Sequence, residues 1–422
     1  MKFQAPRGTN DRLPQDQPRW GRVTGAARET AETFGYGRID TPLFEDARLF
    51  ARGIGEVTDV VEKETYTFDD RGGDPLTLRA EGTAPVCRAY LEHGMQNLPQ
   101  PVRLYYFCPV FRYERPQAGR YRQHHQFGIE VIGSDEPQVD AEVIDVGWSL
   151  LGDLGIPGLK LLLNTMGDME TRSAYVAELQ TYFRDHLDAI PDEIRSRVEA
   201  NPLRVLDSKD PRMADITVGA PRSVDHLGPD AADHWAALLG HLDALGIPYQ
   251  IEHSLVRGFD YYTRTVFEIV PERTGSQSTI IGGGRYDGLI EELGGKPTPG
   301  IGFGMGIERV VAALSQESTE ASPTVKVLVA HMGDEARREA VTLAAELRRT
   351  GVATVVAPAR GLKSQLRYAS SIDASHALIL GEDELRDGIV TLRDFATSQQ
   401  SSVKRSDIAA TLTAGGRRED AG

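Results

Sequence analysis

The chain has 422 residues, of which 40% are hydrophobic and 26% are charged, a composition typical of globular proteins and unlike that of disordered or fibrous chains. Its 62 acidic residues outnumber 47 lysines and arginines, and the net charge of −15 argues against non-specific coating of nucleic acid. No apolar run approaches the roughly 20 residues of a membrane span, and the first residues do not have the pattern of a signal peptide. We therefore expect a cytoplasmic protein without membrane contact.

The cysteines and histidines do not predict a metal centre. Cys87 and Cys108 are the two cysteines, and they lack the close spacing of a zinc-binding or redox pair. The ten histidines do not form a set with metal-ligand spacing. We expect reduced, buried thiols and no protein-bound metal ion.

The first part of the chain predicts one helix followed by extended segments. Apolar residues at spacings of three and four indicate an amphipathic helix from Trp20 to Phe34. Strands are predicted at 66–68, 76–78, 102–114 and 126–133, a helix at 142–154 and a further strand at 159–164. The third and fourth of these strands have the pattern of a long antiparallel hairpin.

The rest of the chain changes character twice. Residues 168–245 are rich in Asp and favour helices, which indicates an inserted helical domain. Strand signals resume at 249–255, 262–270 and 278–289, and the glycine-rich segment 299–306 leads into a helix at 305–314. Strands at 325–333, 352–358 and 377–381, with a helix at 334–349, predict a small α/β domain with a mixed or parallel sheet.

Three clusters of residues carry candidate chemistry, and the first two are rich in charged side chains. In the first, Phe111–Glu130, strand alternation places Arg112 and Glu114 on one face, and further arginines follow in the loop. Arginine suits phosphate because its planar guanidinium donates two hydrogen bonds and keeps its charge. The second cluster, Leu255–Glu268, has a polar face, and burying these polar groups without water or a ligand would cost free energy. We therefore expect this face to line a cleft that holds water or a ligand. The alternatives are a solvated basic hairpin and a solvated sheet edge.

The third cluster is the segment GIGFGMGIERV at 300–310. Its glycines would let a flat ligand approach the backbone closely, and Glu308 and Arg309 begin the helix that follows. The segment is not a phosphate-binding loop of the GxxxxGK[ST] type. The segment GGGRYDGL at 282–289 is similarly glycine-rich.

In order and spacing, these clusters resemble the motifs of class II aminoacyl-tRNA synthetases, and specifically those of the histidyl-tRNA synthetase family. GYGRIDTPLFED (35–46) resembles motif 1, FRYERPQAGRYRQHHQFGIE (111–130) motif 2 and GIGFGMGIERV motif 3. LVRGFDYYTRTVFE and GGGRYDGL resemble the two histidine-specific signatures. RGTND (7–11), LRAEGTAPVCR (78–88), NPLRVLDSKDP (201–211) and ALILGEDEL (377–385) also match. The resemblance runs from Pro6 to about Gln400.

The resemblance implies an α+β catalytic domain with a mostly antiparallel sheet flanked by helices, a helical insertion and a C-terminal α/β anticodon-binding domain. The implied divisions are catalytic residues 1–167, the insertion at 168–245, catalytic residues 246–320, the anticodon-binding domain at 325–410 and a disordered tail at 411–422.

The family's functional residues carry over to four sets of positions in this chain. The implied catalytic set is Arg257, Arg112 and Gln126. The implied histidine-binding set is Glu81, Gly82, Thr83, Arg112, Gln126, Glu130, Arg257, Tyr261 and Tyr262. The implied ATP-binding set is Arg112, Glu114, Tyr121, His124 and Arg309. Arg115 and Gln117 are implied at the tRNA acceptor end.

The resemblance also implies individual roles. Arg112 would bind the α-phosphate of ATP and Arg309 the γ-phosphate, while Glu130 and Tyr262 would bind the imidazole nitrogens of histidine. Glu81, Thr83 and Gln126 would hold its α-amino group. Arg257 would contact the histidine carboxylate and the α-phosphate. The chain departs from the family pattern at Ala80, usually Pro, and at His124, usually a Phe that stacks on adenine.

The implied activity is ATP-dependent activation of L-histidine followed by transfer to the 3′ end of tRNA(His), with Mg²⁺ arriving with ATP and with a homodimer as the assembly. One alternative is the non-catalytic, histidine-sensing regulatory subunit of ATP phosphoribosyltransferase. A second is a synthetase-like scaffold that binds tRNA without chemistry. The signature arginines and the C-terminal α/β segment favour the enzyme.

Overall fold

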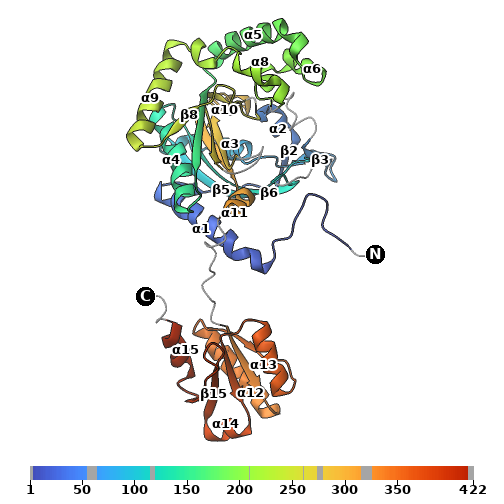
Figure 1. The fold of residues 1–422 in the computed structure, drawn as a ribbon, viewed down its shortest axis with the longest axis vertical. Coiled ribbons are helices and arrows are strands. Elements are labelled where there is room, and N and C mark those ends of the chain that lie inside the picture. Colours follow the sequence, from blue (N-terminus) through green and yellow to red (C-terminus); the bar gives the residue numbers. More distant parts are fainter. Residues whose placement is uncertain are drawn as a thin grey trace. The chain divides into compact units, whose positions relative to one another are not determined.

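The computed structural model describes residues 3–54, 64–114, 119–208, 210–259, 261–272, 279–314 and 326–416 (Figure 1). Contacts between residues divide the chain into two compact units, Met1–Thr319 and Glu320–Gly422. Each unit has its own sheet and its own hydrophobic core.

A mostly antiparallel sheet of eight strands among the described residues forms the centre of the larger unit. In spatial order its strands are β1 (Gly37–Arg38), β5 (Val102–Phe111), β6 (Gln123–Ile132), β11 (Gly300–Gly306), β10 (Ile281–Arg285), β9 (Thr263–Pro271), β7 (Leu159–Thr165) and β8 (Tyr249–Ile251). The two edge pairs, β1 with β5 and β7 with β8, run parallel. The predicted antiparallel sheet flanked by helices is confirmed.

One face of this sheet is covered by helices that bury its apolar side chains. These helices are α1 (Gln17–Thr33), α4 (Pro137–Asp153), α9 (Pro229–Leu245) and α11 (Ile307–Ala313). Every second residue of a strand contributes, as Ile129 of β6 and Phe303 of β11 do. The predicted helix at 20–34 is confirmed as α1, whose Val23, Ala27 and Ala31 are fully buried.

The opposite face of the sheet is more polar and is only partly covered. It meets α3 (Thr83–Glu92) and α10 (Leu289–Glu292), with a small sheet of β2 (Phe44–Asp46), β4 (Pro75–Leu78) and β3 (Tyr66–Asp69) nearby, beside α2 (Ala47–Ile54). Tyr106 of β5 and Glu130 of β6 lie on this face and are almost or fully buried. The candidate site is therefore to be sought here.

Between β7 and β8 the described chain forms only helices. They are α5 (Met169–Asp185), α6 (Asp192–Ala200), α7 (Pro202–Leu206), α8 (Ala214–Val218) and α9, with short 3-10 turns. Helices α5, α6 and α8 gather at the top of the larger unit in Figure 1. Helix α9 instead packs on α4, and its Trp235, Leu238 and Leu242 belong to the core beneath the sheet. By packing, α9 therefore belongs with the helices that cover this face of the sheet.

The predicted hairpin is confirmed, and several other elements differ from prediction. Strands β5 and β6 pair from Val102 with Ile132 to Phe111 with Gln123. The segment Gly300–Gly306, which carried no strand prediction, is β11 and lies in mid-sheet between β6 and β10. Strand β8 stops at Ile251 instead of 255, because the chain then leaves the sheet.

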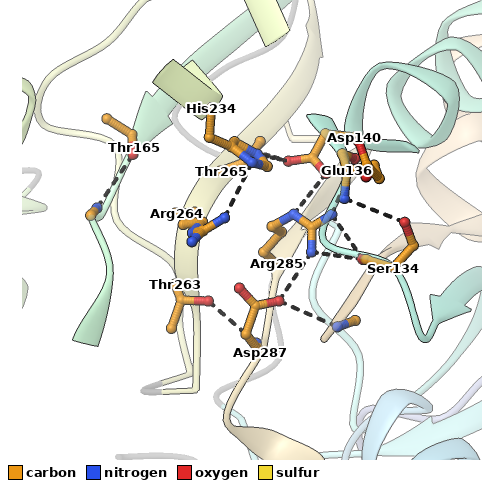
Figure 2. A network of polar contacts seen from close by, with 12 residues as sticks. Ser134, Glu136, Asp140, Thr165, His234, Thr263, Arg264, Thr265, Arg285 and Asp287 are labelled. Carbon is orange, nitrogen blue, oxygen red and sulfur yellow. Dashed lines mark hydrogen bonds and ion pairs between the residues drawn. The ribbon is translucent and has the colours of Figure 1, made fainter. Parts of the chain in front are cut away.

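A buried polar network ties α4 and α9 to the sheet (Figure 2). Asp140 of α4 is fully buried and accepts hydrogen bonds from Arg285 Nε at 2.7 Å and Thr265 Oγ1 at 2.6 Å. His234 Nε2 of α9 lies 2.9 Å from the same carboxylate, and Arg264 Nη1 lies 3.3 Å from His234 Nδ1. The network joins four elements behind the sheet, on the side away from Glu130.

The smaller unit has a mixed five-stranded sheet among the described residues. Its strands, in spatial order, are β13 (Ala353–Val356), β12 (Lys326–His331), β14 (His376–Leu380), β15 (Ile389–Asp394) and β16 (Gln400–Lys404). Its helices are α12 (Asp334–Arg349), α13 (Leu362–Ser371), α14 (Glu382–Asp387) and α15 (Ile408–Gly416). Strand β12 pairs in parallel with both β13 and β14, and β15 pairs antiparallel with both β14 and β16. The prediction of a disordered tail at 411–422 is wrong for residues 411–416, because α15 continues to Gly416.

Across the part of the chain that the structure describes, no helix has both the length and the apolar character needed to cross a bilayer.

Candidate active site

A cavity of about 200 Å³ opens on the polar face of the large sheet. Its lining includes most of the site residues implied by the sequence, drawn from five separate segments of the chain. These are Glu81, Thr83, Arg112, Glu114, Tyr121, His124, Gln126, Arg257, Tyr261, Tyr262 and Arg309. The sequence predicts that Arg112 and Glu114 lie within a strand at 102–114. In the structure both residues follow the end of β5 at Phe111.

Glycines on β10 and β11 make room for the charged groups of the site. A Cβ on Gly282 would lie 2.2 Å from the guanidinium of Arg257, and a Cβ on Gly302 would lie 2.0 Å from Oε2 of Glu130. Both approaches are far closer than real Cβ contacts allow. The glycine pattern is therefore a steric requirement of these two side chains, in addition to any access it gives to a ligand.

Positive charge gathers at one end of the cavity. Arg112, Arg120 and Arg309 all line it, and Glu114 Oε2 lies 3.3 Å from Arg120 Nε. Arg309 donates to the carbonyls of Gly119 at 3.2 Å and Thr279 at 2.7 Å. Burial lowers the pKa of Arg309, and the neighbouring arginines lower it further. Such mutual repulsion is relieved by a bound anion, so this end suits a polyphosphate.

His124 stands beside these arginines as a neutral imidazole. Burial, together with the positive charges of Arg112 and Arg309, lowers the pKa of His124 to about 3. At neutral pH the ring therefore adds no charge to the arginine cluster. A neutral imidazole that lines the cavity can stack on a flat ligand.

Arg257 projects over β10 and is held by an acidic partner. Its Nη1 donates to Oε1 of Glu268 on β9, and the other oxygen of Glu268 accepts a 2.6 Å hydrogen bond from Thr279. Its Nε is buried without a hydrogen-bond partner among the described residues. The guanidinium is thus anchored at one end by Glu268, and Arg257 lines the cavity in which a ligand would lie.

Two buried carboxylates lie at the other end of the site. Glu81 accepts hydrogen bonds from the backbone nitrogens of Thr83 at 2.6 Å and Ala84 at 2.7 Å, at the start of α3. Burial raises the pKa of Glu81 despite these donors. Its position at a helix N-terminus keeps a negative charge tolerable next to the cavity.

Glu130 is fully buried and surrounded by hydroxyl groups. It accepts hydrogen bonds from Thr83 Oγ1 at 2.7 Å, Tyr106 at 3.1 Å and Tyr286 at 2.6 Å. Burial raises the pKa of its carboxyl to about 8, although the hydroxyls act in the opposite direction. Thr83 and Tyr106 line the cavity, whereas Glu130 is one layer behind them.

Aromatic rings form a wall next to these carboxylates. Tyr261 stacks on Phe259 with ring centres 5.3 Å apart and lies 4.6 Å from Tyr262. The ring of Phe259 also faces the guanidinium of Arg112 at 5.5 Å. Flat apolar walls with a few fixed polar groups are typical of a small-molecule site.

Some of the implied site residues do not line the cavity, and some residues that line it were not predicted from the sequence. Gly82 and Glu130 do not line the cavity, and Arg115 and Gln117 fall outside the described residues. The missed lining residues include Tyr106 and Phe259, whereas Arg120 is one of the loop arginines predicted to suit phosphate. Strand alternation gave a signal for Tyr106, because it shares a face with Gln126 and Glu130 across the β5–β6 pair. No group of three or more potential metal ligands occurs among the described residues.

Comparison with known proteins gives matches over nearly the whole chain. The family model for Histidyl-tRNA synthetase matches residues 8–310, and that for an Anticodon binding domain matches residues 325–414. A protein of Dehalococcoides mccartyi named Histidine--tRNA ligase is 50% identical over 404 residues, covering 95% of this chain and 97% of the relative.

Solved structures agree with these matches. The apo S. aureus histidyl-tRNA synthetase superposes with a TM-score of 0.81 at 35% identity, covering 97% of this chain and 100% of that one. A Bacillus halodurans C structure described as an ATP phosphoribosyltransferase regulatory subunit/histidyl-tRNA synthetase shares the fold, with a TM-score of 0.66 at 23% identity, covering 90% of this chain and 99% of that one.

Proposed function

Because this chain belongs to the histidyl-tRNA synthetase family, we infer that it is a histidine--tRNA ligase, which activates L-histidine with ATP and then transfers the histidyl group to tRNA. The observation that carries this function is the cavity itself. It joins an arginine cluster suited to polyphosphate with buried carboxylates suited to a cationic amino acid.

The carboxylate end of the cavity accounts for histidine. Glu81, Thr83 and Gln126 hold the α-amino group, and Tyr262 with Glu130 recognises the imidazole. The hydroxyls of Thr83 and Tyr106 donate to Glu130 and line the cavity, so they are the groups next to the ligand. A site whose buried polar groups need partners discriminates strongly against analogues that lack the ring nitrogens.

The arginine end accounts for ATP. Arg112 binds the α-phosphate and Arg309 the γ-phosphate, while neutral His124 stacks on adenine beside Tyr121. Mg²⁺ enters as part of the MgATP substrate and neutralises phosphate charge. Glu114 suits it, because its carboxylate lines the cavity and Oε2 makes no hydrogen bond among the described residues, although Arg120 lies 3.3 Å away as its ionic partner.

Arg257 has the central role in activation. A histidine carboxylate oxygen attacks the α-phosphorus of ATP, and pyrophosphate leaves with the bonding electrons. Two anions must approach, and negative charge grows on the phosphorus oxygens. The positive charge of the Arg257 guanidinium stabilises both, and fixed electrostatic stabilisation of this kind commonly contributes most to an enzyme's rate enhancement. The terminal ribose hydroxyl of tRNA then attacks the carbonyl carbon of the adenylate and AMP leaves.

The remaining parts of the proposal concern partners. The C-terminal unit contacts the anticodon, where unstacked bases can be read, and Arg115 with Gln117 meets the acceptor end. The proposed assembly is a homodimer formed through motif 1, whose Leu43 and Phe44 are 47% and 51% exposed, apolar surface of the kind that a second subunit covers. The substrates imply the cytoplasm as its compartment.

The deciding experiment is histidine-dependent exchange between ATP and pyrophosphate by the purified chain. Exchange with histidine and with no other amino acid is expected. Histidine binding without exchange would instead favour the regulatory-subunit alternative. Arg257→Ala is expected to slow exchange by at least about a hundredfold. A loss of less than about tenfold, or ~1.4 kcal/mol, would refute the role given to Arg257.

A further inference from the structure

The segment between β8 and β9 carries Arg257 and Tyr262 but has little regular structure of its own. It leaves the sheet after Ile251 and returns at Thr263. Side chains from other elements hold its backbone carbonyls. Asn164 of β7 donates to the carbonyls of His253 at 3.2 Å and Leu255 at 3.1 Å, which fixes the first half of the segment to the sheet.

The half nearest the cavity is held by the helical insertion. Arg204 of α7 donates from Nη2 to the carbonyl of Gly258, the residue directly after Arg257. Arg172 of α5 donates from Nη1 to the carbonyl of Tyr262 at 2.9 Å. Two guanidinium groups from the insertion thus hold the backbone on both sides of the aromatic wall, and hydrogen bonds from charged donors are stronger than neutral ones.

The insertion also packs tightly behind this segment. The gap between them is about 10 Å³ and is lined by residues of both parts, which leaves space for about one water molecule. Leu203 of the insertion and Val256 of the segment are both buried there. A displacement of α7 would therefore be transmitted to Arg257 rather than absorbed by empty space.

We propose that Arg204 and Arg172 are positioning residues for histidine activation, through which docking of the helical insertion sets the orientation of Arg257 and Tyr262. The inference rests on the proposed function and adds a route by which a ligand of the insertion controls the catalytic cavity. Neither arginine needs to touch a substrate. Arg204 acts through the carbonyl of Gly258, next to Arg257, and Arg172 acts through the carbonyl of Tyr262 itself. A shift of about 1 Å in a reacting group can cost about a hundredfold in rate.

The test compares three variants of the full chain. Arg204→Met and Arg172→Met remove the donors but keep an unbranched apolar stem. Arg184→Met is the matched control, because Arg184 also belongs to the insertion and pairs with Glu199 at 2.5 Å, away from the segment. We expect kcat for histidine-dependent pyrophosphate exchange to fall by about tenfold to a hundredfold in the first two. The KM for ATP and the urea midpoint should stay close to those of the control.

The outcomes separate this inference from the proposed function. A wild-type chain without exchange refutes the function itself. Exchange in the wild type, with Arg204→Met within about threefold of Arg184→Met, refutes the positioning role. A loss that follows a lower urea midpoint is settled with Arg204→Lys, which keeps a charged donor. Recovery of kcat in that variant supports positioning, and no recovery at a wild-type midpoint contradicts it.

Discussion

Two fully buried carboxylates, one on each side of the large sheet, differ sharply in their surroundings. Asp140 is enclosed by Arg285, His234 and Thr265 (Figure 2). Burial alone would raise the pKa of Asp140, but the charge of Arg285 and the contacts of His234 bring it below its ordinary value. Glu130 is enclosed by three hydroxyls instead, and burial raises its pKa to about 8.

The difference separates a carboxylate that holds the fold from one that serves a ligand. A buried charge is tolerated when a cation and hydrogen bonds surround it. Asp140 has both within the chain, so it is complete without a ligand. Glu130 has hydroxyl donors alone, and two of them, from Thr83 and Tyr106, also line the cavity, so a ligand ring would interact with Glu130 through these hydroxyls. Four predictions test this comparison, in decreasing order of expected effect.

The largest effect is expected from Arg285→Met, which removes the cation from the Asp140 network. An unpaired buried carboxylate costs about 3–5 kcal/mol, and His234 and Thr265 compensate only in part. The free energy of unfolding in urea at pH 7 measures this loss. A decrease below about 1 kcal/mol would show that Asp140 does not need its cation. The double variant Arg285→Met with Asp140→Asn is the control, and it should recover part of the stability.

Glu130→Gln is expected to separate function from stability. The amide keeps an oxygen for the surrounding hydroxyls but cannot become negative. Histidine-dependent exchange should fall by about a hundredfold in kcat/KM, which is ~2.7 kcal/mol, while the free energy of unfolding at pH 7 is at least that of wild type, because the amide is buried uncharged without taking up a proton. Steady-state kinetics and urea unfolding of the same preparation give both values. A large loss of stability with normal kinetics would reverse the roles assigned to the two carboxylates.

Gly302→Ala sharpens the comparison sterically. The added Cβ would meet Oε2 of Glu130 at 2.0 Å and the carbonyl of Ile129 at 2.3 Å, and overpacking of this kind costs roughly 1–3 kcal/mol. Thermal or urea unfolding with a histidine-binding assay measures both consequences. Gly306→Ala is the matched control on the same strand, because its Cβ meets its nearest neighbour at an ordinary 3.5 Å. Equal stability in the two variants would contradict the packing argument.

The effect that is smallest per measured step, at one pH unit at a time, is a dependence of stability on pH, with opposite signs for the two carboxylates. The pKa of Glu130 is raised from 4.5 to about 8, so between these values the folded state holds a proton that the unfolded state releases. The free energy of unfolding should then fall as pH rises, by up to about 1.4 kcal/mol per pH unit. Asp140, with a lowered pKa, loses its contribution only as pH falls below its ordinary value. Urea titrations of wild type and Glu130→Gln isolate the first contribution, and identical slopes would refute it.

The sequence predicted the hairpin and the identity of most cavity residues, because these depend on local patterns. The β5–β6 pair follows from two apolar and aromatic runs, and Arg112, Arg257 and Arg309 follow from motifs. The alternation of glycine with apolar residues in β11 was also a strand pattern of period two, but it was interpreted as a glycine-rich segment because glycine disfavours strands.

Other features depend on tertiary structure and left no local signal. Arg285 lies in the glycine-rich segment GGGRYDGL that resembles a histidine-specific signature, yet a register shift between Gly284 and Arg285 accompanies its burial behind the sheet with Asp140. Which carboxylate receives a cation is decided by the packing of α4 on the sheet, since Asp140 and Arg285 are 145 residues apart. The contact of Arg204 with Gly258 spans 54 residues and is equally invisible in a motif.

Strand β11 separates two tasks within seven consecutive residues. Ile301, Phe303 and Met305 pack against the helices, while on the opposite face Gly302 makes room for Glu130 and Gly304 and Gly306 line the cavity. Changes at the odd-numbered positions alter how the helices pack, and changes at Gly304 and Gly306 alter what the cavity admits. Because different residues control the two properties, the size of the ligand accepted can diverge between relatives without repacking the core. The same division gives protein engineers a short segment in which selectivity can be varied one methyl group at a time.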